Sequence, residues 1–103
     1  MLWDKKKYKI KLKGGRGVAS TDPMQGLIEH LIVIPNKIDM IWSMQIKDMA
    51  GDVIYEVIDN EGRLDDKDGL PVGFPHQEKL NIIIYDTTIN DEVNVIFKVG
   101  ETR

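Results

Sequence analysis

The stretch DMIWSMQIKDMAGDVIYEVI (residues 39–58) decides the fold class of this chain. Its first half alternates polar residues with four large apolar ones, Met40, Trp42, Met44 and Ile46. This period of two is typical of a β-strand with one buried face and one face in water. A glycine at position 51 then occupies a usual hairpin position before a second apolar run. The stretch therefore predicts a β-hairpin.

Other segments carry the same β signal. Residues 7–13 place Tyr8, Ile10 and Leu12 opposite four lysines, and the following glycines end that strand. Residues 79–85 (KLNIIIY) and 92–99 (EVNVIFKV) read as two further strands, and residues 59–62 (DNEG) predict a turn. Residues 63–75 combine acids, glycines and two prolines, which predicts a surface segment with at most a short strand.

Residues 20–35 admit two interpretations. Asp22 could cap a helix with Pro23 at its first position, because apolar residues farther on recur at helical spacing. Several of those residues are β-branched, however, and suit a pleated strand better. They are Ile28, Ile32, Val33 and Ile34. We favour a loop through about residue 25, followed by a strand over residues 27–34.

Together these segments predict an all-β protein, an antiparallel β-sandwich of about six to eight strands with an immunoglobulin-like architecture. The chain has no cysteine, so Trp42 counts as a generic core aromatic and not as part of the disulfide-bridged immunoglobulin core. A length of 103 residues predicts a single domain, residues 1–103. Residues 1–17 form its basic N-terminal strand and glycine turn.

Composition excludes several functional classes. The longest apolar run, residues 31–35, is too short to cross a bilayer, and the N-terminus lacks the pattern of a secretory signal. We therefore expect no membrane contact and no export. With no cysteine and only two histidines, a structural metal is not expected, and no cofactor is predicted.

No catalytic motif is present. Neither Ser20 nor Ser43 lies in a nucleophile elbow, and His30 and His76 have no characteristic spacing to an acid. The glycines near residue 15 do not form a phosphate loop, since no Gly-Lys-Ser/Thr follows them. The acidic residues near position 62 could supply oxygen ligands to calcium, but the EF-hand pattern fails there, so a solvated loop is the preferred interpretation. We expect a protein that is not an enzyme.

Charge is unevenly distributed along the chain, although the net charge is only -3. Residues 1–17 contain seven basic residues against one acid, and residues 39–68 contain nine acids against three basic residues. The candidate partner-binding residues are the basic ones: Lys5, Lys6, Lys7, Lys9, Lys11, Lys13 and Arg16. A possible acidic counter-surface consists of Asp59, Glu61, Asp65, Asp66 and Asp68. Such a polarised molecule can pair charges within one subunit or between neighbouring copies.

The lysines have three interpretations. They can be the solvated face of an edge strand, where lysine protects against aggregation. They can dock on an acidic protein surface, which would explain both halves of the charge asymmetry. They can also bind nucleic acid, with Trp3 or Tyr8 stacking on a base. The negative net charge and the position of Tyr8 on the apolar side of the strand make nucleic acid the weakest of the three.

The layout of residues 39–99 resembles a known family. The alternating strand leads into IKDMAGDVIYE (46–56), then GRL (62–64) and LPVG (70–73), and closes with LNIII (80–84), a turn and VNVIF (93–97). This order is similar to that of the small β-sandwich virion proteins of tailed bacteriophages. The resemblance covers about 60% of the chain and lies in layout, without a diagnostic motif.

The resemblance implies a virion structural protein, either a capsid decoration (cement) protein or a head-to-tail connector component. Its partners would be the major capsid protein or other virion proteins, and it would form a homo-oligomer within a virion assembled in the host cytoplasm. It implies no catalytic residue. A stand-alone binding module for protein, carbohydrate or nucleic acid is the alternative, although Phe74 is the only aromatic residue in a clearly loop-like stretch.

Overall fold

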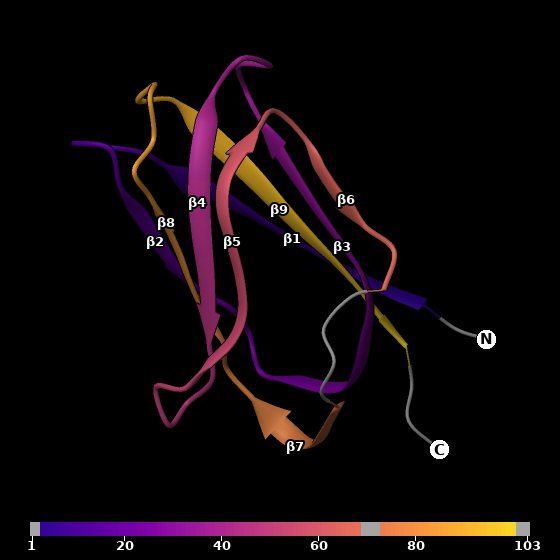
Figure 1. The fold of residues 1–103 in the computed structure, drawn as a ribbon. Coiled ribbons are helices and arrows are strands. Elements are labelled where there is room, and N and C mark those ends of the chain that lie inside the picture. The colour runs from indigo at the N-terminus through magenta and orange to yellow at the C-terminus, as the bar shows by residue number, and fades with distance from the viewer. Residues whose placement is uncertain (1–2, 69–72, 101–103) are drawn as a thin grey trace.

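The protein is described by a computed structural model that covers the backbone of residues 3–68 and 73–100 and the side chains of these residues apart from 3–4, 24–26 and 73–77. Two antiparallel sheets pack face to face (Figure 1). The first sheet has the order β1 (Trp3–Lys11), β9 (Glu92–Gly100), β3 (Met24–Pro35) and β6 (Leu64–Asp66), with β7 (Gly73–Glu78) also paired to β3. The second has the order β2 (Gly17–Ser20), β8 (Asn81–Tyr85), β4 (Ile41–Lys47) and β5 (Val53–Glu61).

The strand pairs are nested around one hairpin. Strands β4 and β5 form that hairpin, and the pairs β3–β6, β2–β8 and β1–β9 follow outward from it. An antiparallel ribbon that folds over into two sheets in this way is a jelly roll. The predicted all-β antiparallel sandwich is therefore confirmed. The described residues contain nine strands, because β2 was not predicted and the segment after residue 62 forms two short strands where at most one was expected.

The immunoglobulin-like strand order was wrong. In immunoglobulin domains of the constant type the first strand lies beside the second in one sheet. Here β1 pairs with the last strand, β9, and β2 belongs to the other sheet. The chain changes sheet after every strand except β4 and β6, and among the described strands only β4 and β5 are consecutive neighbours in one sheet.

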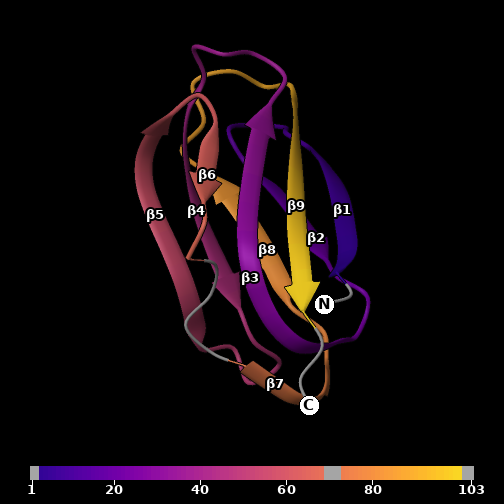
Figure 2. The same ribbon diagram turned by 90° about the vertical axis from the view of Figure 1, so that its right-hand side faces the viewer.

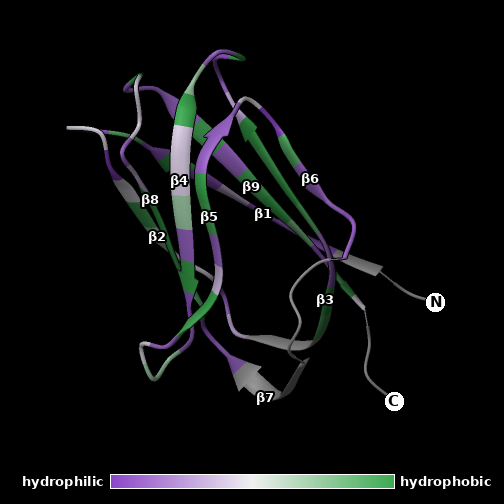
Figure 3. Ribbon diagram, in the orientation of Figure 1, coloured by the Kyte–Doolittle hydropathy of each residue, from purple (hydrophilic) through white to green (hydrophobic). Residues whose placement is uncertain are grey.

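The core lies between the sheets, and the predicted alternation of β4 is confirmed there. Met40, Trp42, Met44 and Ile46 are all fully buried. The first sheet contributes Ile10, Leu31 and Phe97, among others, and Tyr8 packs edge-on against Phe97 with ring centroids 6.0 Å apart. Figure 3 shows hydrophobic residues along most of β3 and hydrophilic residues at the end of β5. Each large apolar side chain buried in this core stabilises the fold by about 1.5–3 kcal/mol.

The favoured interpretation of residues 20–35 is confirmed, because they form no helix and contain the strand β3, which begins at Met24, slightly earlier than expected. Two other local predictions needed correction. The turn predicted at residues 59–62 is shorter, because β5 continues to Glu61. Ser43, which the alternation places on the solvent face, is buried. The strand β5 bulges opposite Ser43, where Asp59 has a φ of 51° and donates its backbone N–H to the Ser43 hydroxyl at 3.0 Å.

Candidate functional site

The strand β1 forms one edge of the first sheet, because it pairs only with β9. Its alternate side chains lie on the exposed face, and Lys13, two residues after its end, is exposed as well. We call these five lysines the basic edge: Lys5, Lys7, Lys9, Lys11 and Lys13. Lys9 lies 3.7 Å from Glu92, whereas the other four make no ion pair within the described residues. Most of the charge on this edge is thus available to a partner.

Two of the predicted basic residues lie elsewhere. Lys6 is opposite Phe97 in the β1–β9 register, faces away from the basic edge and is half-buried. Arg16 lies after the tight turn formed by Gly14 and Gly15, whose φ values of 64° and 78° suit glycine. The basic edge therefore comprises five of the seven predicted residues.

The phenolic ring of Tyr8 is not available to stack on a base. Its hydroxyl accepts a hydrogen bond of 3.1 Å from the backbone N–H of Asp22, and its ring packs on Phe97. This arrangement gives Tyr8 a structural role that ties β1 to the segment after β2.

The predicted acidic residues are brought together on the opposite side of the sandwich. Strand β5 is an edge of the second sheet and β6 an edge of the first, and a two-residue turn connects them. Figure 2 shows β5 and β1 at opposite sides of the molecule. We call this side the acidic edge, and its members are Asp59, Glu61, Asp65, Asp66 and Asp68.

Two of these acids already have partners. The His30 ring donates a hydrogen bond to Asp65, which also lies 3.5 Å from Arg63, and these contacts hold the pKa of Asp65 below its usual value. Asp66 accepts a hydrogen bond of 2.7 Å from the Tyr55 hydroxyl. Burial, together with this bond, raises the pKa of Tyr55. The remaining three carboxylates make no hydrogen bond or ion pair with the described residues.

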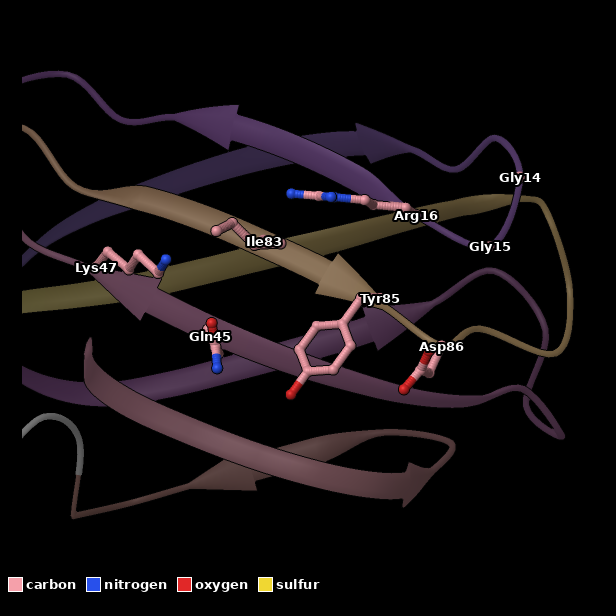
Figure 4. Close-up of a pocket in the computed structure, with 8 residues that line it drawn as sticks. All are labelled: Gly14, Gly15, Arg16, Gln45, Lys47, Ile83, Tyr85 and Asp86. Atoms are coloured by element: carbon pink, nitrogen blue, oxygen red, sulfur yellow. The ribbon is translucent and has the colours of Figure 1, made fainter. Parts of the chain in front are cut away.

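A second feature, which sequence reasoning missed, is a groove on the outer face of the second sheet (Figure 4). It is open to solvent and has a volume of about 470 Å³. Its floor is on β8, and its walls come from β4 and from the turn before β2. The lining residues are Gly14, Gly15, Arg16, Gln45, Lys47, Ile83, Tyr85 and Asp86. The alternation of each strand placed Gln45 and Lys47 on a solvent face, but only the sheet order shows that these strands are neighbours.

The groove contains both cations and hydrogen-bond acceptors. Arg16 and Lys47 make no ion pair with any residue that the structure describes. The Gln45 side-chain amide donates to Glu56 at 2.6 Å. Partial burial, with the carboxylates of Glu56, Asp86 and Asp59, raises the pKa of Tyr85. Its hydroxyl is therefore protonated at neutral pH.

The remaining candidate residues do not form a site. Among the described residues, no group of three or more histidine, aspartate or glutamate side chains could hold a metal ion. The side chains of His76 and Phe74 lie outside the described residues. The Ser20 hydroxyl donates a hydrogen bond of 2.8 Å to the Asn81 side-chain oxygen, so its partner is an amide and not a histidine that could act as a catalytic base. The described part of the chain holds no helix with the length and apolar character needed to traverse a bilayer.

Comparisons with known proteins show the fold alone. No protein-family model matches the chain, and no curated protein sequence matches it. The solved structure titled "Crystal structure of PirA" is similar, with a TM-score of 0.53 and 10% sequence identity over 91% of this chain and 92% of that one. The structure titled "Crystal Structure of FLHE" has a TM-score of 0.43 and 11% identity over 96% and 95% of the two chains. At such identities, the likeness to PirA indicates a shared fold and transfers no function.

Proposed function

We propose that this protein is a non-enzymatic structural protein of a tailed-bacteriophage virion, a capsid decoration (cement) protein. It would attach through the basic edge to an acidic surface of the major capsid protein or of another virion protein. The observation that carries this proposal is the separation of exposed charge, most of it unpaired among the described residues, onto opposite edges of one sandwich. The resemblance in strand layout supplies the virion context.

The basic edge suits a weak contact that is repeated many times. Alternate residues of a strand are about 6.7 Å apart, so the lysines present a regular row of positive charge. Each exposed ion pair contributes less than about 1 kcal/mol. On a symmetric shell many copies bind at once, and a shared contact to neighbouring subunits converts weak individual affinities into strong attachment.

The same polarity supports contacts between copies. The basic edge of one molecule is complementary to the acidic edge of a second, and neither edge is complementary to itself. Contacts of this head-to-tail kind close into rings when the rotation permits. Ring closure favours a second candidate function, a head-to-tail connector component, in which copies would form a ring at the vertex where a tail attaches.

Nucleic acid is a weaker partner for this surface. A DNA-binding protein gains affinity by neutralising phosphates, and the acidic edge would repel them. The net charge of -3 adds to this repulsion. The carboxylates of Asp59, Glu61 and Asp68 make no ion pair with a described residue that would offset it.

Rebinding to virions tests the proposal. Virions that contain the protein would be purified and stripped of it. They would then be incubated either with the unmodified protein or with the triple variant Lys7→Glu, Lys9→Glu and Lys11→Glu. Occupancy would be measured by sedimentation and negative-stain microscopy. We expect the unmodified protein to rebind and the triple variant to lose occupancy about tenfold or more.

The matched control reverses three exposed lysines outside the basic edge, Lys37, Lys67 and Lys79. This control should rebind like the unmodified protein, and circular dichroism should show that both variants fold. Equal rebinding of the two variants, or absence of the protein from purified particles, would contradict the proposal.

A further inference from the structure

The groove on the outer face of the second sheet has the size and rigidity of a ligand site. Its volume of about 470 Å³ lies within the range of about 300–1,000 Å³ that is usual for small-molecule pockets. In Figure 4, the side chains of Arg16 and Gln45 lie on either side of Ile83, and Lys47 and Asp86 lie toward opposite ends. The groove is therefore surrounded by polar groups above an apolar floor.

The turn that positions Arg16 is fixed by neighbouring segments. The backbone N–H of Gly15 donates to the Asn90 side chain at 2.7 Å, and Thr87 donates its N–H to the Gly15 carbonyl at 3.2 Å. Lys13 and Arg16 also exchange two backbone hydrogen bonds. A preformed wall of this kind lowers the entropy lost when a ligand binds.

The charge of the groove favours an anionic ligand. Arg16 and Lys47 line it without an ion-pair partner among the described residues. Asp86 is the one carboxylate among the lining residues, and Glu56 lies beside the groove, where its carboxylate accepts the hydrogen bond of Gln45. A guanidinium group matches a carboxylate through two parallel hydrogen bonds, which gives orientation as well as affinity. A carboxylate group of the ligand thus fits beside Arg16.

The acceptors of the groove require a ligand that also donates hydrogen bonds. The Gln45 amide nitrogen is engaged by Glu56, which leaves its oxygen free to accept. The Asp86 carboxylate is a further acceptor. An acidic peptide side chain carries negative charge without a hydroxyl donor, so it would leave these acceptors unpaired. A sugar that bears a carboxylate offers both the charge and the donors.

The apolar floor of the groove also suits a sugar ring. Ile83 and the Tyr85 ring present apolar surface, which can cover the C–H face of a sugar ring, while the tyrosine hydroxyl can donate or accept. We infer that this groove binds an acidic saccharide, either a uronic acid or a sialic acid, with Arg16 and Lys47 on the carboxylate and Gln45 and Asp86 on the hydroxyls. This site goes beyond the proposed virion attachment and uses no residue of the basic edge.

Titration calorimetry and amide NMR shifts with defined sugars test the inference. The probes are trigalacturonate, 3′-sialyllactose, neutral maltotriose and hexaglutamate. We expect one or both acidic sugars to bind at a Kd of about 1 mM or tighter, with shifts at Ile83 and Tyr85, and we expect no binding of maltotriose or hexaglutamate up to about 10 mM. The two acidic sugars distinguish a uronate ligand from a sialylated one.

Variants assign the binding to the groove. Arg16→Gln and Lys47→Gln should each weaken binding of the acidic sugar about tenfold or more, and Arg16→Lys should recover only part of the loss because the planar fork is missing. Lys13→Gln removes a cation of the same turn that does not line the groove, and it should change the Kd by less than about twofold. The NMR spectrum of each variant reports whether it folds.

Several outcomes would overturn the inference. The first is that neither acidic sugar binds at about 10 mM, and the second is that maltotriose binds as tightly as the acidic sugars. The third is that hexaglutamate binds as tightly as the sugars, and the fourth is that Lys13→Gln loses as much affinity as Arg16→Gln. Hexaglutamate binding would instead assign the groove to an acidic peptide. The triple variant Lys7→Glu, Lys9→Glu and Lys11→Glu should retain sugar binding, so failure of virion attachment and failure of this inference are distinguishable.

Discussion

The indole N–H of Trp42 donates a buried hydrogen bond of 2.8 Å to the backbone carbonyl of Gly62, twenty residues farther along the chain. The bond joins the centre of the core to the turn between β5 and β6, at the start of the acidic edge. Trp42 is fully buried, and its polar atom has this partner inside the protein. The position of the acidic edge is thereby tied to the core.

A side chain at position 62 is expected to destabilise the fold. The φ of 71° at Gly62 is strained for other residues, and a β-carbon would lie 2.8 Å from the Ile38 carbonyl oxygen. Gly62→Ala should lower the free energy of unfolding by about 1–3 kcal/mol in urea titrations. The control is Gly51→Ala, where φ is 88° but a β-carbon meets no atom within 4 Å. It should cost less, and equal losses would show that the clash with Ile38 is unimportant.

The buried hydroxyl of Thr21 is expected to stabilise the connection between β2 and β3. It accepts a hydrogen bond of 2.9 Å from the backbone N–H of Leu80 and donates to the Asp22 carbonyl. Thr21→Val keeps the shape but leaves the Leu80 N–H without this partner, which should cost about 1–3 kcal/mol in thermal or urea unfolding. Thr88→Val is the matched control, because the Thr88 hydroxyl accepts a bond of 3.0 Å from Ile41 at an exposed site. Water can replace that bond, so a larger loss at position 88 would refute the explanation.

The hydrogen bond between His30 and Asp65 should make stability depend on pH in acid. This bond, with Arg63 and Lys67 nearby, lowers the pKa of Asp65 in the folded protein. The stabilisation is therefore present above the unfolded value of about 3.9 and is lost as the pH falls through the lower folded value. Comparison of Tm across pH should show Asp65→Asn below the unmodified protein above about pH 5, with the difference vanishing in stronger acid.

The control for this measurement is Glu61→Gln, which alters an exposed carboxylate with no partner among the described residues. Its Tm should stay near that of the unmodified protein at each pH. A Tm difference for Asp65→Asn that persists unchanged at the lowest pH would mean that the carboxylate charge is not responsible.

Association between copies should follow the complementarity of the two edges. A basic-edge variant (Lys7→Glu, Lys9→Glu and Lys11→Glu) and an acidic-edge variant (Asp59→Lys and Glu61→Lys) should each sediment as monomers. Mixed together at about 20 mM salt they should form hetero-oligomers, and about 500 mM salt should dissociate them because exposed charges are screened. Analytical ultracentrifugation measures this. A mixture that remains monomeric at low salt would exclude edge-to-edge contact.

The sequence by itself determined which residues lie inside and which lie outside on individual strands. Met40, Trp42, Met44 and Ile46 were assigned to the core, and Lys7, Lys9, Lys11 and Lys13 to the solvent, because the period of two is a local property of the strand. The break of this pattern at Ser43 was not predictable, since it depends on a bulge in the partner strand.

Only the tertiary structure decided which strands are neighbours. Backbone hydrogen bonds are the same for every sequence, so alternation could not distinguish the jelly-roll order from the immunoglobulin order. That order places the basic and acidic edges on opposite sides and assembles the groove from Arg16, Gln45 and Tyr85, which lie on three different segments. The alternation within one strand therefore predicts which of its residues face the solvent. Which strands bring those residues together into a site depends on pairing between segments that are distant in the sequence.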